Sequence, residues 1–154
     1  MNIIIHRGTH QIGGSAIEIS TKSTRIILDF GNELSLDEKY IPINLDIDGV
    51  TKGMLDCDGI VISHYHMDHL GQLTSALPEI PLYMGKLSKE VAMIATEHQD
   101  KDLYLRLLDA NTFRGGEAFT IGNIHIRPLV IDHSAVDSYM FVIEAEGKRV
   151  LYTG

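Results

Sequence analysis

The sequence predicts an α+β fold in which helices flank a mixed, mostly antiparallel sheet. Two observations predict it: short apolar runs bounded by turn residues recur along the whole chain, whereas helical periodicity is confined to a few segments. With 154 residues, 44% of them hydrophobic and 22% charged, the chain has the composition of an ordinary globular domain. We therefore expect one domain over residues 1–154, without linkers, repeats or low-complexity tracts.

Strands are expected wherever an alternating or continuous apolar run is bounded by turn residues. The run Gly59–Ser63 is apolar at consecutive positions, which indicates a strand buried on both faces. Towards the end of the chain, two alternating runs flank Glu146 and Gly147, which predicts a hairpin that turns there. The strands expected in chain order are Asn2–His6, Ser15–Ser20, Arg25–Asp29, Gly59–Ser63, Pro81–Met84, Ala118–Ile121, Ile124–Val130, Ser138–Ala145 and Lys148–Tyr152.

Three segments are expected to be helical, and one long segment is expected to lack regular structure. In the segment Lys86–His98, the residues Val91, Ile94 and Ala95 share one face, which predicts an amphipathic helix with that face buried. The other two helices are shorter. Helices are expected at His69–Ala76, Lys86–His98 and Asp102–Leu108, and a loop around one short element is expected at Asn32–Met54.

The most informative feature is a cluster of metal-binding side chains directly after the predicted strand Gly59–Ser63. Within six residues the chain carries His64, His66, Asp68 and His69. Zinc prefers imidazole nitrogen and carboxylate oxygen, and alternate residues of an extended loop put the first two histidines on the same side. The next two side chains can face a second metal position nearby. The plainer alternative is a polar loop that happens to be rich in histidine.

The spacing His-x-His-x-Asp-His resembles the signature of the metallo-β-lactamase superfamily. Arg25–Gly31 is similar to the early strand of that family, which ends in an aspartate, and Ile131–Ser134 is similar to the later loop that supplies a further histidine, His133. The resemblance implies that the chain forms the N-terminal portion of an αββα sandwich. It also implies that Asp29 is not a ligand but holds the metal loop in place.

Further residues are similar to the ribonuclease J and β-CASP branch of this superfamily, whose members process nucleic acids. They are Gly8–Ser15, Asp132–Ser134 followed by Asp137 and Ser138, and the closing Leu151–Gly154. This resemblance implies that the full-length parent hydrolyses phosphodiesters of RNA or DNA. Because Thr153 and Gly154 come just before the family's bridging aspartate, the chain is expected to be an incomplete domain in which the second metal site lacks ligands. An apolar face would then be left for a second copy, as a homodimer, to cover.

The resemblance implies a division of roles among the site residues. His64, His66 and His133 would hold a first zinc and leave a fourth position for water, which the metal converts to a hydroxide nucleophile. Asp68 and His69 would hold the second metal, with Asp68 also orienting or deprotonating the attacking water. Mn²⁺ or Fe²⁺ could replace zinc at such ligands. A hydrogen bond from Ser134, rather than a nucleophilic role, is expected to fix the His133 loop.

Composition and charge bear on location and substrate. The net charge of −8 and the isoelectric point near 5.4 argue against a strongly basic nucleic-acid footprint, although bound metal would add positive charge at the site. The single cysteine, Cys57, excludes an intrachain disulfide and is expected to be a buried small residue. Without a signal peptide or an apolar run of membrane-spanning length, a cytoplasmic location is expected.

Two rival functions remain open from the sequence. The first is hydrolysis of a thioester, lactone or β-lactam with the same metal-bound hydroxide acting on a carbonyl carbon. The second is a truncated, non-catalytic half-domain that binds only a metal or a partner. The other histidines, His6, His10, His98 and His125, lack partners at ligand spacing and are expected to be structural or exposed.

Overall fold

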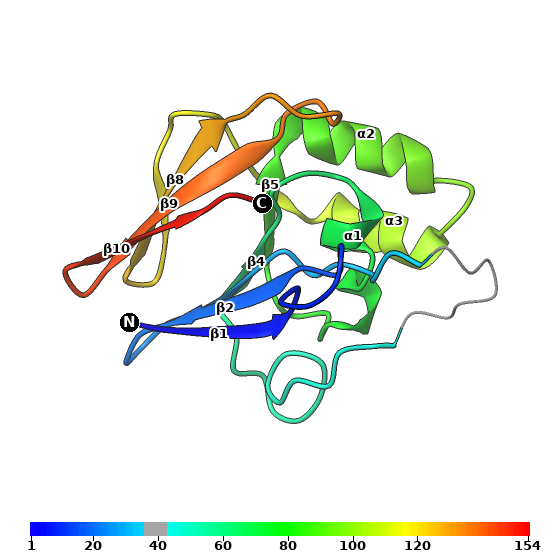
Figure 1. Cartoon of the computed structure of the whole chain (residues 1–154). Coiled ribbons are helices and arrows are strands. Elements are labelled where there is room, and N and C mark those ends of the chain that lie inside the picture. The colour runs from blue at the N-terminus through cyan, green and yellow to red at the C-terminus, as the bar shows by residue number, and fades with distance from the viewer. Residues whose placement is uncertain (36–42) are drawn as a thin grey trace.

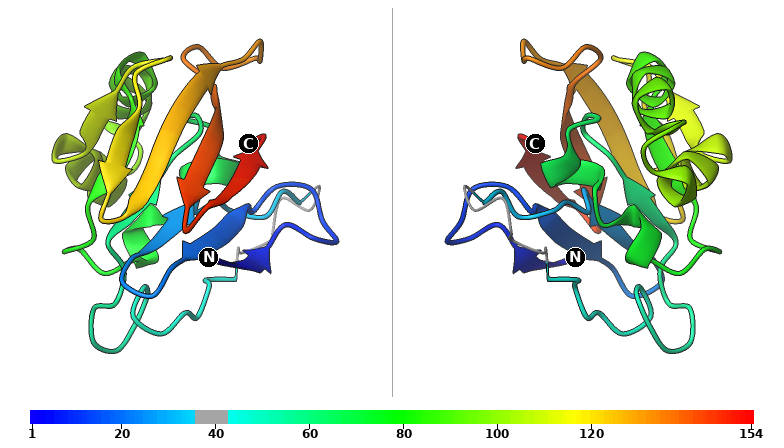
Figure 2. Two further views of the ribbon diagram at one scale, coloured as in Figure 1. Left: turned by 90° about the vertical axis from the view of Figure 1, so that its left-hand side faces the viewer. Right: turned by 90° about the vertical axis from the view of Figure 1, so that its right-hand side faces the viewer.

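Two β-sheets and a layer of helices make up the computed structural model, which describes residues 1–35 and 43–154 (Figure 1). The six-stranded sheet lies between the helices and the four-stranded sheet, so the chain forms three layers (Figure 2). The elements in chain order are β1 (Asn2–Arg7), β2 (Ala16–Ser20), β3 (Arg25–Leu28), β4 (Gly59–Val61), α1 (Met67–Leu70), a 3₁₀ turn (Leu73–Ser75), β5 (Leu82–Gly85), α2 (Lys86–Thr96), α3 (Lys101–Leu108), β6 (Asn111–Phe113), β7 (Phe119–Ile121), β8 (Ile124–Val130), β9 (Tyr139–Ala145) and β10 (Lys148–Tyr152).

Strand pairing changes once from antiparallel to parallel within the six-stranded sheet, whose order is β1-β2-β3-β4-β5-β6. The first three strands form an antiparallel meander, and the pairs from β3 to β6 are parallel. The four-stranded sheet, in the order β10-β9-β8-β7, is antiparallel throughout. The predicted mixed and mostly antiparallel α+β architecture is therefore confirmed.

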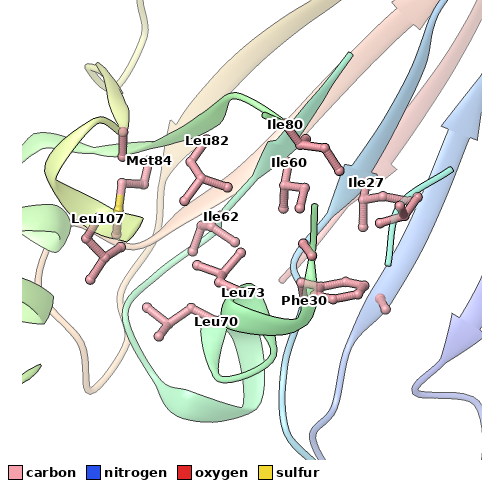
Figure 3. Packing of buried hydrophobic residues seen from close by; sticks show 14 of the residues in the cluster. Ile27, Phe30, Ile60, Ile62, Leu70, Leu73, Ile80, Leu82, Met84 and Leu107 are labelled. Atoms are coloured by element: carbon pink, nitrogen blue, oxygen red, sulfur yellow. The ribbon is translucent and has the colours of Figure 1, made fainter. Parts of the chain in front are cut away.

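The two faces of the central sheet bury two separate apolar cores because successive side chains of a strand point in opposite directions. On β3, Ile27 faces the helices while Ile26 and Leu28 face the second sheet. On the helical side, Ile60 of β4 and Ile62, just after it, meet residues of α1, the 3₁₀ turn and α3 (Figure 3). On the other side, the core between the sheets contains Ile19, Val61, Ile124, Ile126, Phe141 and Ile143.

All the predicted strands are present with bounds within two residues of those expected, and the hairpin turns at Glu146 and Gly147 as predicted. Both turn residues have a positive φ, 50° and 70°, which suits a two-residue hairpin loop. The sequence analysis missed β6, Asn111–Phe113, which is too short to show an alternating pattern. It pairs with β5 at the edge of the sheet.

The predicted helix His69–Ala76 is wrong in both position and length. Helix α1 covers only Met67–Leu70, and a separate 3₁₀ turn follows at Leu73–Ser75. Three carbonyl groups of α1 accept hydrogen bonds from distant backbone amides: those of Met67, Asp68 and His69 bind the N–H groups of residues 32, 15 and 30. The N–H of Gln72 in turn donates to residue 30 instead of continuing the helix. Tertiary hydrogen bonds therefore replace helical ones here.

Helix α2 is present where predicted, but the face expected to be buried is not the one that packs on the core. Ile94 is 77% exposed, whereas Ser88, Ala92 and Thr96 are buried. These small side chains allow the helix to lie close to the sheet and to α3. The face containing Val91 and Ile94 points away from the core, contrary to the prediction.

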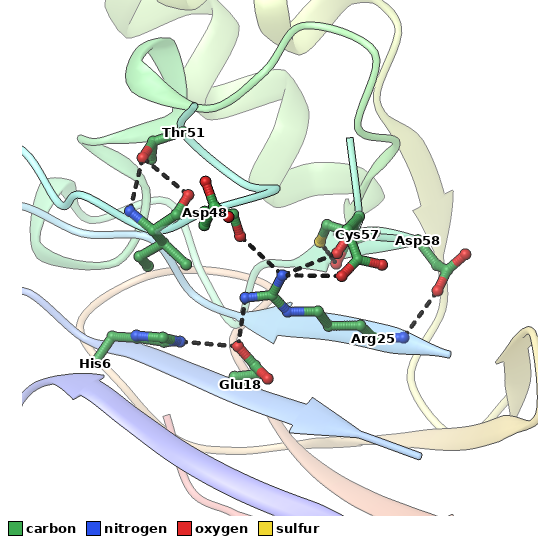
Figure 4. Close-up of polar contacts among 10 residues, drawn as sticks. His6, Glu18, Arg25, Asp48, Thr51, Cys57 and Asp58 are labelled. Atoms are coloured by element: carbon green, nitrogen blue, oxygen red, sulfur yellow. Dashed lines mark hydrogen bonds and ion pairs between the residues drawn. The ribbon is translucent and has the colours of Figure 1, made fainter. Parts of the chain in front are cut away.

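Polar contacts, rather than regular structure, attach part of the segment 43–58 to the sheet (Figure 4). Arg25 donates hydrogen bonds to the carbonyl groups of Asp48 and Asp56 and to the carboxylate of Glu18, at 2.8–3.1 Å. Cys57 is buried, as predicted, and burial raises the pKa of its thiol to about 11. The described part of the loop expected at 32–54 contains isolated bridges but no helix or strand, and residues 36–42 lie outside the described residues.

The outer face of the four-stranded sheet is partly apolar, with Met140 and Val142 half-buried and Leu151 exposed. The expectation that a second copy covers an open apolar face stays a prediction. Among the described residues, none of the helices has the length and apolar character needed to cross a membrane.

Replacing Phe141 by alanine should lower the free energy of unfolding by about 3–5 kcal/mol, because a fully buried aromatic ring between the two sheets would leave a cavity. The neighbouring Val142, which points to the other side of the same strand, provides the control. Its replacement by alanine should cost about 1 kcal/mol or less. Urea denaturation followed by circular dichroism measures both, and equal losses would contradict the two-layer packing.

Candidate metal centre

The predicted metal-binding residues lie where two loops meet, one from each sheet. The first loop leaves the C-terminal end of β4, and the second, residues 131–138, connects β8 to β9. The N–H of Tyr139 donates to the carbonyl of Ser63 at 3.1 Å, which joins the second loop to the end of β4. A further bond, from Ile131 N to Ser138 O at 3.1 Å, closes the base of the second loop. His133 is thereby brought to the first loop.

Three imidazole rings converge at this point, those of His64, His66 and His133. His64 Nε2 lies 3.1 Å from His66 Nδ1 and 3.2 Å from His133 Nε2. One nitrogen from each ring falls within 4.8 Å of the others. His64 is buried, His66 is half-buried and His133 is exposed, so the group is open on one side. Three nitrogens with an open side suit a tetrahedral ion that keeps a fourth position free.

Asp68 and His69 lie on α1 beside this group but face a different point. His69 Nε2 is 3.4 Å from Asp68 Oδ2, and the rings of His69 and His64 have their centroids 4.0 Å apart. His69 is buried and Asp68 is half-buried. The two residues therefore offer one nitrogen and one carboxylate oxygen next to the three-histidine group.

Asp29 accepts the hydrogen bonds that orient the three-histidine group, through Ser63 and His64, and the Asp68–His69 pair, through His69. Its side chain is fully buried at the end of β3, and its φ of 55° is in the left-handed region, which aspartate tolerates. Oδ1 accepts a bond from Ser63 N at 2.7 Å. Oδ2 accepts bonds from Ser63 Oγ at 2.7 Å, His69 Nδ1 at 2.7 Å and the Tyr152 hydroxyl at 2.6 Å. The buried carboxylate is thus fully satisfied by donors.

This network assigns the positions of the protons on two imidazole rings. His69 donates from Nδ1 to Asp29, which leaves Nε2 with a free lone pair. Because the Ser63 hydroxyl donates its proton to Asp29, its oxygen accepts from His64 Nδ1 at 3.0 Å. The Nε2 atom of His64 therefore also carries a free lone pair. His64 Nε2 faces the rings of His66 and His133, and His69 Nε2 faces Asp68. Each lone pair is therefore on the nitrogen that metal ligation requires.

Burial and neighbouring rings favour the neutral form of two of the three histidines, His64 and His66, by lowering their pKa. Burial, followed by the positive potential of His69, lowers the pKa of His64 to about 3. Burial and the proximity of His133 also lower the pKa of His66. Burial likewise opposes protonation of His69, but the hydrogen bond to Asp29 and the negative charges of Asp29 and Asp68 together outweigh it and raise that pKa. The donor set fits a divalent cation, which needs unprotonated nitrogens.

Two glycines allow neighbouring chain segments to approach the metal loop closely, that is, residues 63–69 after β4. A Cβ atom on Gly31 would lie 1.6 Å from the carbonyl oxygen of Asp68, and one on Gly13 would lie 2.8 Å from Asp68 Cβ. Backbone hydrogen bonds from Ser15 and Phe30 to the carbonyls of residues 68 and 69 use this space. The glycine-rich segment 8–15 therefore supports the metal loop through its backbone, whereas His10 is exposed.

Ser134 does not hold the His133 loop as expected. Its side chain is exposed, and its hydroxyl has no hydrogen-bond partner in the part of the chain that the structure describes. Ser138 closes the loop instead, through its hydroxyl, which donates to the carbonyl of Ala135 at 2.7 Å. A residue at the end of the loop can reach back across its turn, whereas Ser134 lies at the tip.

The sequence analysis also missed the roles of Ser63 and Tyr152 at Asp29. Ser63 stands directly before His64, so a search for hydroxyl groups next to the motif could have found it. Tyr152 gives no such signal, because only the packing of the two sheets brings it to Asp29. The remaining histidines lie away from the site: His6 pairs with Glu18, and those at 98 and 125 are exposed.

Comparison with known proteins gives two ribonucleases as relatives over nearly the whole chain. The chain is 26% identical over 164 residues to an RNase J-like protein of Methanocaldococcus jannaschii. This alignment covers 97% of this chain and 35% of the relative. It is 24% identical over 156 residues to ribonuclease J of Helicobacter pylori, in an alignment that covers 96% of this chain and 22% of the relative. The chain thus spans about a fifth to a third of the length of these relatives.

A solved structure and a family model place the fold. A metallo-β-lactamase of Cronobacter sakazakii aligns with a TM-score of 0.60 over 91% of this chain and 55% of that chain, at 14% identity. The family model for the β-lactamase superfamily domain matches residues 42–154. This match covers most of the chain and includes the whole metal loop and the His133 loop. The chain belongs to the β-lactamase superfamily and has the metallo-β-lactamase fold, which implies binding of a divalent metal ion.

Proposed function

We propose that this chain carries the first metal site of a hydrolase that cleaves phosphodiester bonds of nucleic acids, most directly RNA. The observation that carries the proposal is the convergence of one ring nitrogen from each of His64, His66 and His133. The two relatives over nearly the full chain, both of the RNase J type, support the choice of substrate.

The three histidines would hold a zinc ion, for which Mn²⁺ or Fe²⁺ could substitute at ligands of this type. When bound, the ion supplies a Lewis acid that acidifies water and draws charge from a phosphoryl oxygen. His64 is fixed for this task by Ser63, and the exposed His133 leaves one side of the group accessible to a substrate.

Asp68 and His69 would contribute to a second metal position and to proton transfer. Asp68 is half-buried, so its carboxylate can face solvent and substrate, and one oxygen lies 3.4 Å from His69 Nε2. We assign to Asp68 the role of orienting the attacking water and accepting its proton. His69 keeps a fixed orientation because Asp29 holds its other nitrogen.

A nucleic-acid substrate has to approach a chain whose net charge is −8. Cations held at the site would offset this charge locally, because a bound metal ion is the largest local charge in such a site. The substrate would therefore be held through the metal rather than through a basic surface of this chain. A cytoplasmic location, where RNA is processed, is part of the same proposal.

A specific observation favours a second candidate, a hydrolase of thioesters, lactones or β-lactams. A mostly apolar hollow of about 340 Å³ adjoins His66 and is lined by Tyr65, Met67, Leu70 and Ala92 among others. Such a surface could accept an acyl chain beside the metal. The ribonuclease relatives make RNA the leading substrate, and binding of a metal without catalysis by this chain alone is the third alternative.

The first test is zinc binding. The chain should bind close to one zinc ion per molecule with the three histidines intact, and His64→Ala should abolish this binding because it removes the nitrogen central to the group. Elemental analysis of purified protein and a zinc titration measure the stoichiometry and affinity. His98→Ala, an exposed histidine away from the site, is the control and should bind like the unchanged chain. Equal binding by His64→Ala would refute the site.

The second test separates the candidate reactions. With zinc or manganese added, the chain should cleave a labelled RNA or an activated phosphodiester, and Asp68→Asn should reduce this rate by about 10²–10⁴-fold if Asp68 takes up the proton. Asp102→Asn, an exposed position on α3, should leave the rate unchanged. Faster turnover of a thioester or lactone than of the phosphodiester would move the assignment to the second candidate. Absence of both activities in a zinc-loaded chain would support the third.

A further inference from the structure

Tyr152 reaches the metal loop from the far sheet. It is the last residue of β10, the edge strand of the four-stranded sheet, yet its hydroxyl lies 2.6 Å from Asp29 Oδ2 at the end of β3 in the six-stranded sheet. The two residues are 123 positions apart in the sequence. This bond joins the two sheets at the edge where the metal-binding loops lie.

The oxygen that Tyr152 contacts is the one that orients the imidazole rings. Asp29 Oδ2 also accepts the bonds from His69 Nδ1 and from the Ser63 hydroxyl, which in turn accepts from His64. A donor at this oxygen restricts where the carboxylate can rotate. Tyr152 is therefore connected to His69 through two hydrogen bonds and to His64 through three.

The tyrosine itself is held firmly enough to act as a fixed donor. Its ring stacks on Phe141 with planes 4° apart and centroids 6.4 Å apart, and it packs against the core between the sheets. Burial and the nearby Asp29 raise the pKa of its hydroxyl, which keeps the proton on the oxygen. The N–H of Ser15, nearby, donates to the carbonyl of Asp68 at 3.1 Å.

We propose that Tyr152 is a positioning residue of the metal centre, which fixes Asp29 so that His69 directly, and His64 through Ser63, present their ligand nitrogens. The inference rests on the metal site proposed above and adds a residue to it from the second sheet. It differs from a simple bond between sheets in one respect: loss of the hydroxyl should affect the imidazole rings and metal affinity more than it affects stability.

The chain offers a matched control in Tyr139. This residue is also largely buried, lies on the adjacent strand β9 and donates its hydroxyl to a carboxylate, that of Asp137. Asp137 accepts bonds from Leu87 N and Ser88 N at the start of α2 and contacts none of the imidazole rings through a hydrogen bond in the described chain. Tyr139→Phe and Tyr152→Phe therefore remove the same kind of bond, but Tyr139→Phe acts on the loop that carries His133, whereas only Tyr152→Phe removes a donor from Asp29.

The experiment compares the two variants in three measurements: zinc affinity by competition with a chelator, imidazole tautomers by ¹⁵N NMR of the metal-free protein, and stability in urea. Tyr152→Phe should weaken zinc binding by about 10–100-fold, the usual effect of losing a group that orients a ligand. The NMR signals of His69 should change from a single Nδ1-protonated form to a mixture. Tyr139→Phe, which removes no donor from Asp29, should leave the tautomers of His69 and His64 unchanged while lowering stability by a similar amount.

The outcomes separate this inference from the proposed function. Unchanged affinity and tautomers in Tyr152→Phe, or the same change of the His69 tautomers in both variants, would overturn the positioning role. If the unchanged chain binds no zinc, the proposed metal site fails, and the NMR comparison of metal-free proteins still decides whether Tyr152 orients His69. Retained dispersion of the amide signals shows that either variant is folded.

Discussion

The buried carboxylate of Asp29 is the constraint on which the rest of the metal centre depends. An anion with no solvent exposure is stable only if donors replace the water that it has lost, and leaving one donor out costs about 1–3 kcal/mol. Here the donors come from β4, from α1 and from β10. The need to satisfy one side chain therefore fixes the relative positions of the metal loop and both sheets.

A second constraint acts on the backbone. The carbonyl groups of α1 bind amides at positions 15, 30 and 32, so the loop that carries Asp68 and His69 is held by segments far away in the sequence. Gly31 is needed where two of these segments meet, because any side chain there would overlap Asp68. The loop is consequently a rigid part of the sheet edge, which suits ligands that must keep their geometry before an ion arrives.

The sequence predicted those parts of the fold and site that depend on local pattern. Alternation along Ile124–Val130 reflects one buried face, and the spacing of His64, His66, Asp68 and His69 is a local property, so both could be read directly. The break after Leu70, the buried face of α2 and the bond from Tyr152 depend on which segments meet in space. The closure of the His133 loop by Ser138, where the sequence had pointed to Ser134, depends in the same way on how the loop folds.

The hydrogen bond between Tyr152 and Asp29 also has a consequence for folding kinetics. Its two ends are 123 positions apart, and closing so long a loop carries a large entropic cost, so we expect this bond to form after most local structure. The imidazole rings would then remain free to rotate in a chain whose sheets have formed but not docked. Metal capture would follow the docking of the sheets, so the ion would select chains that have already completed their folding.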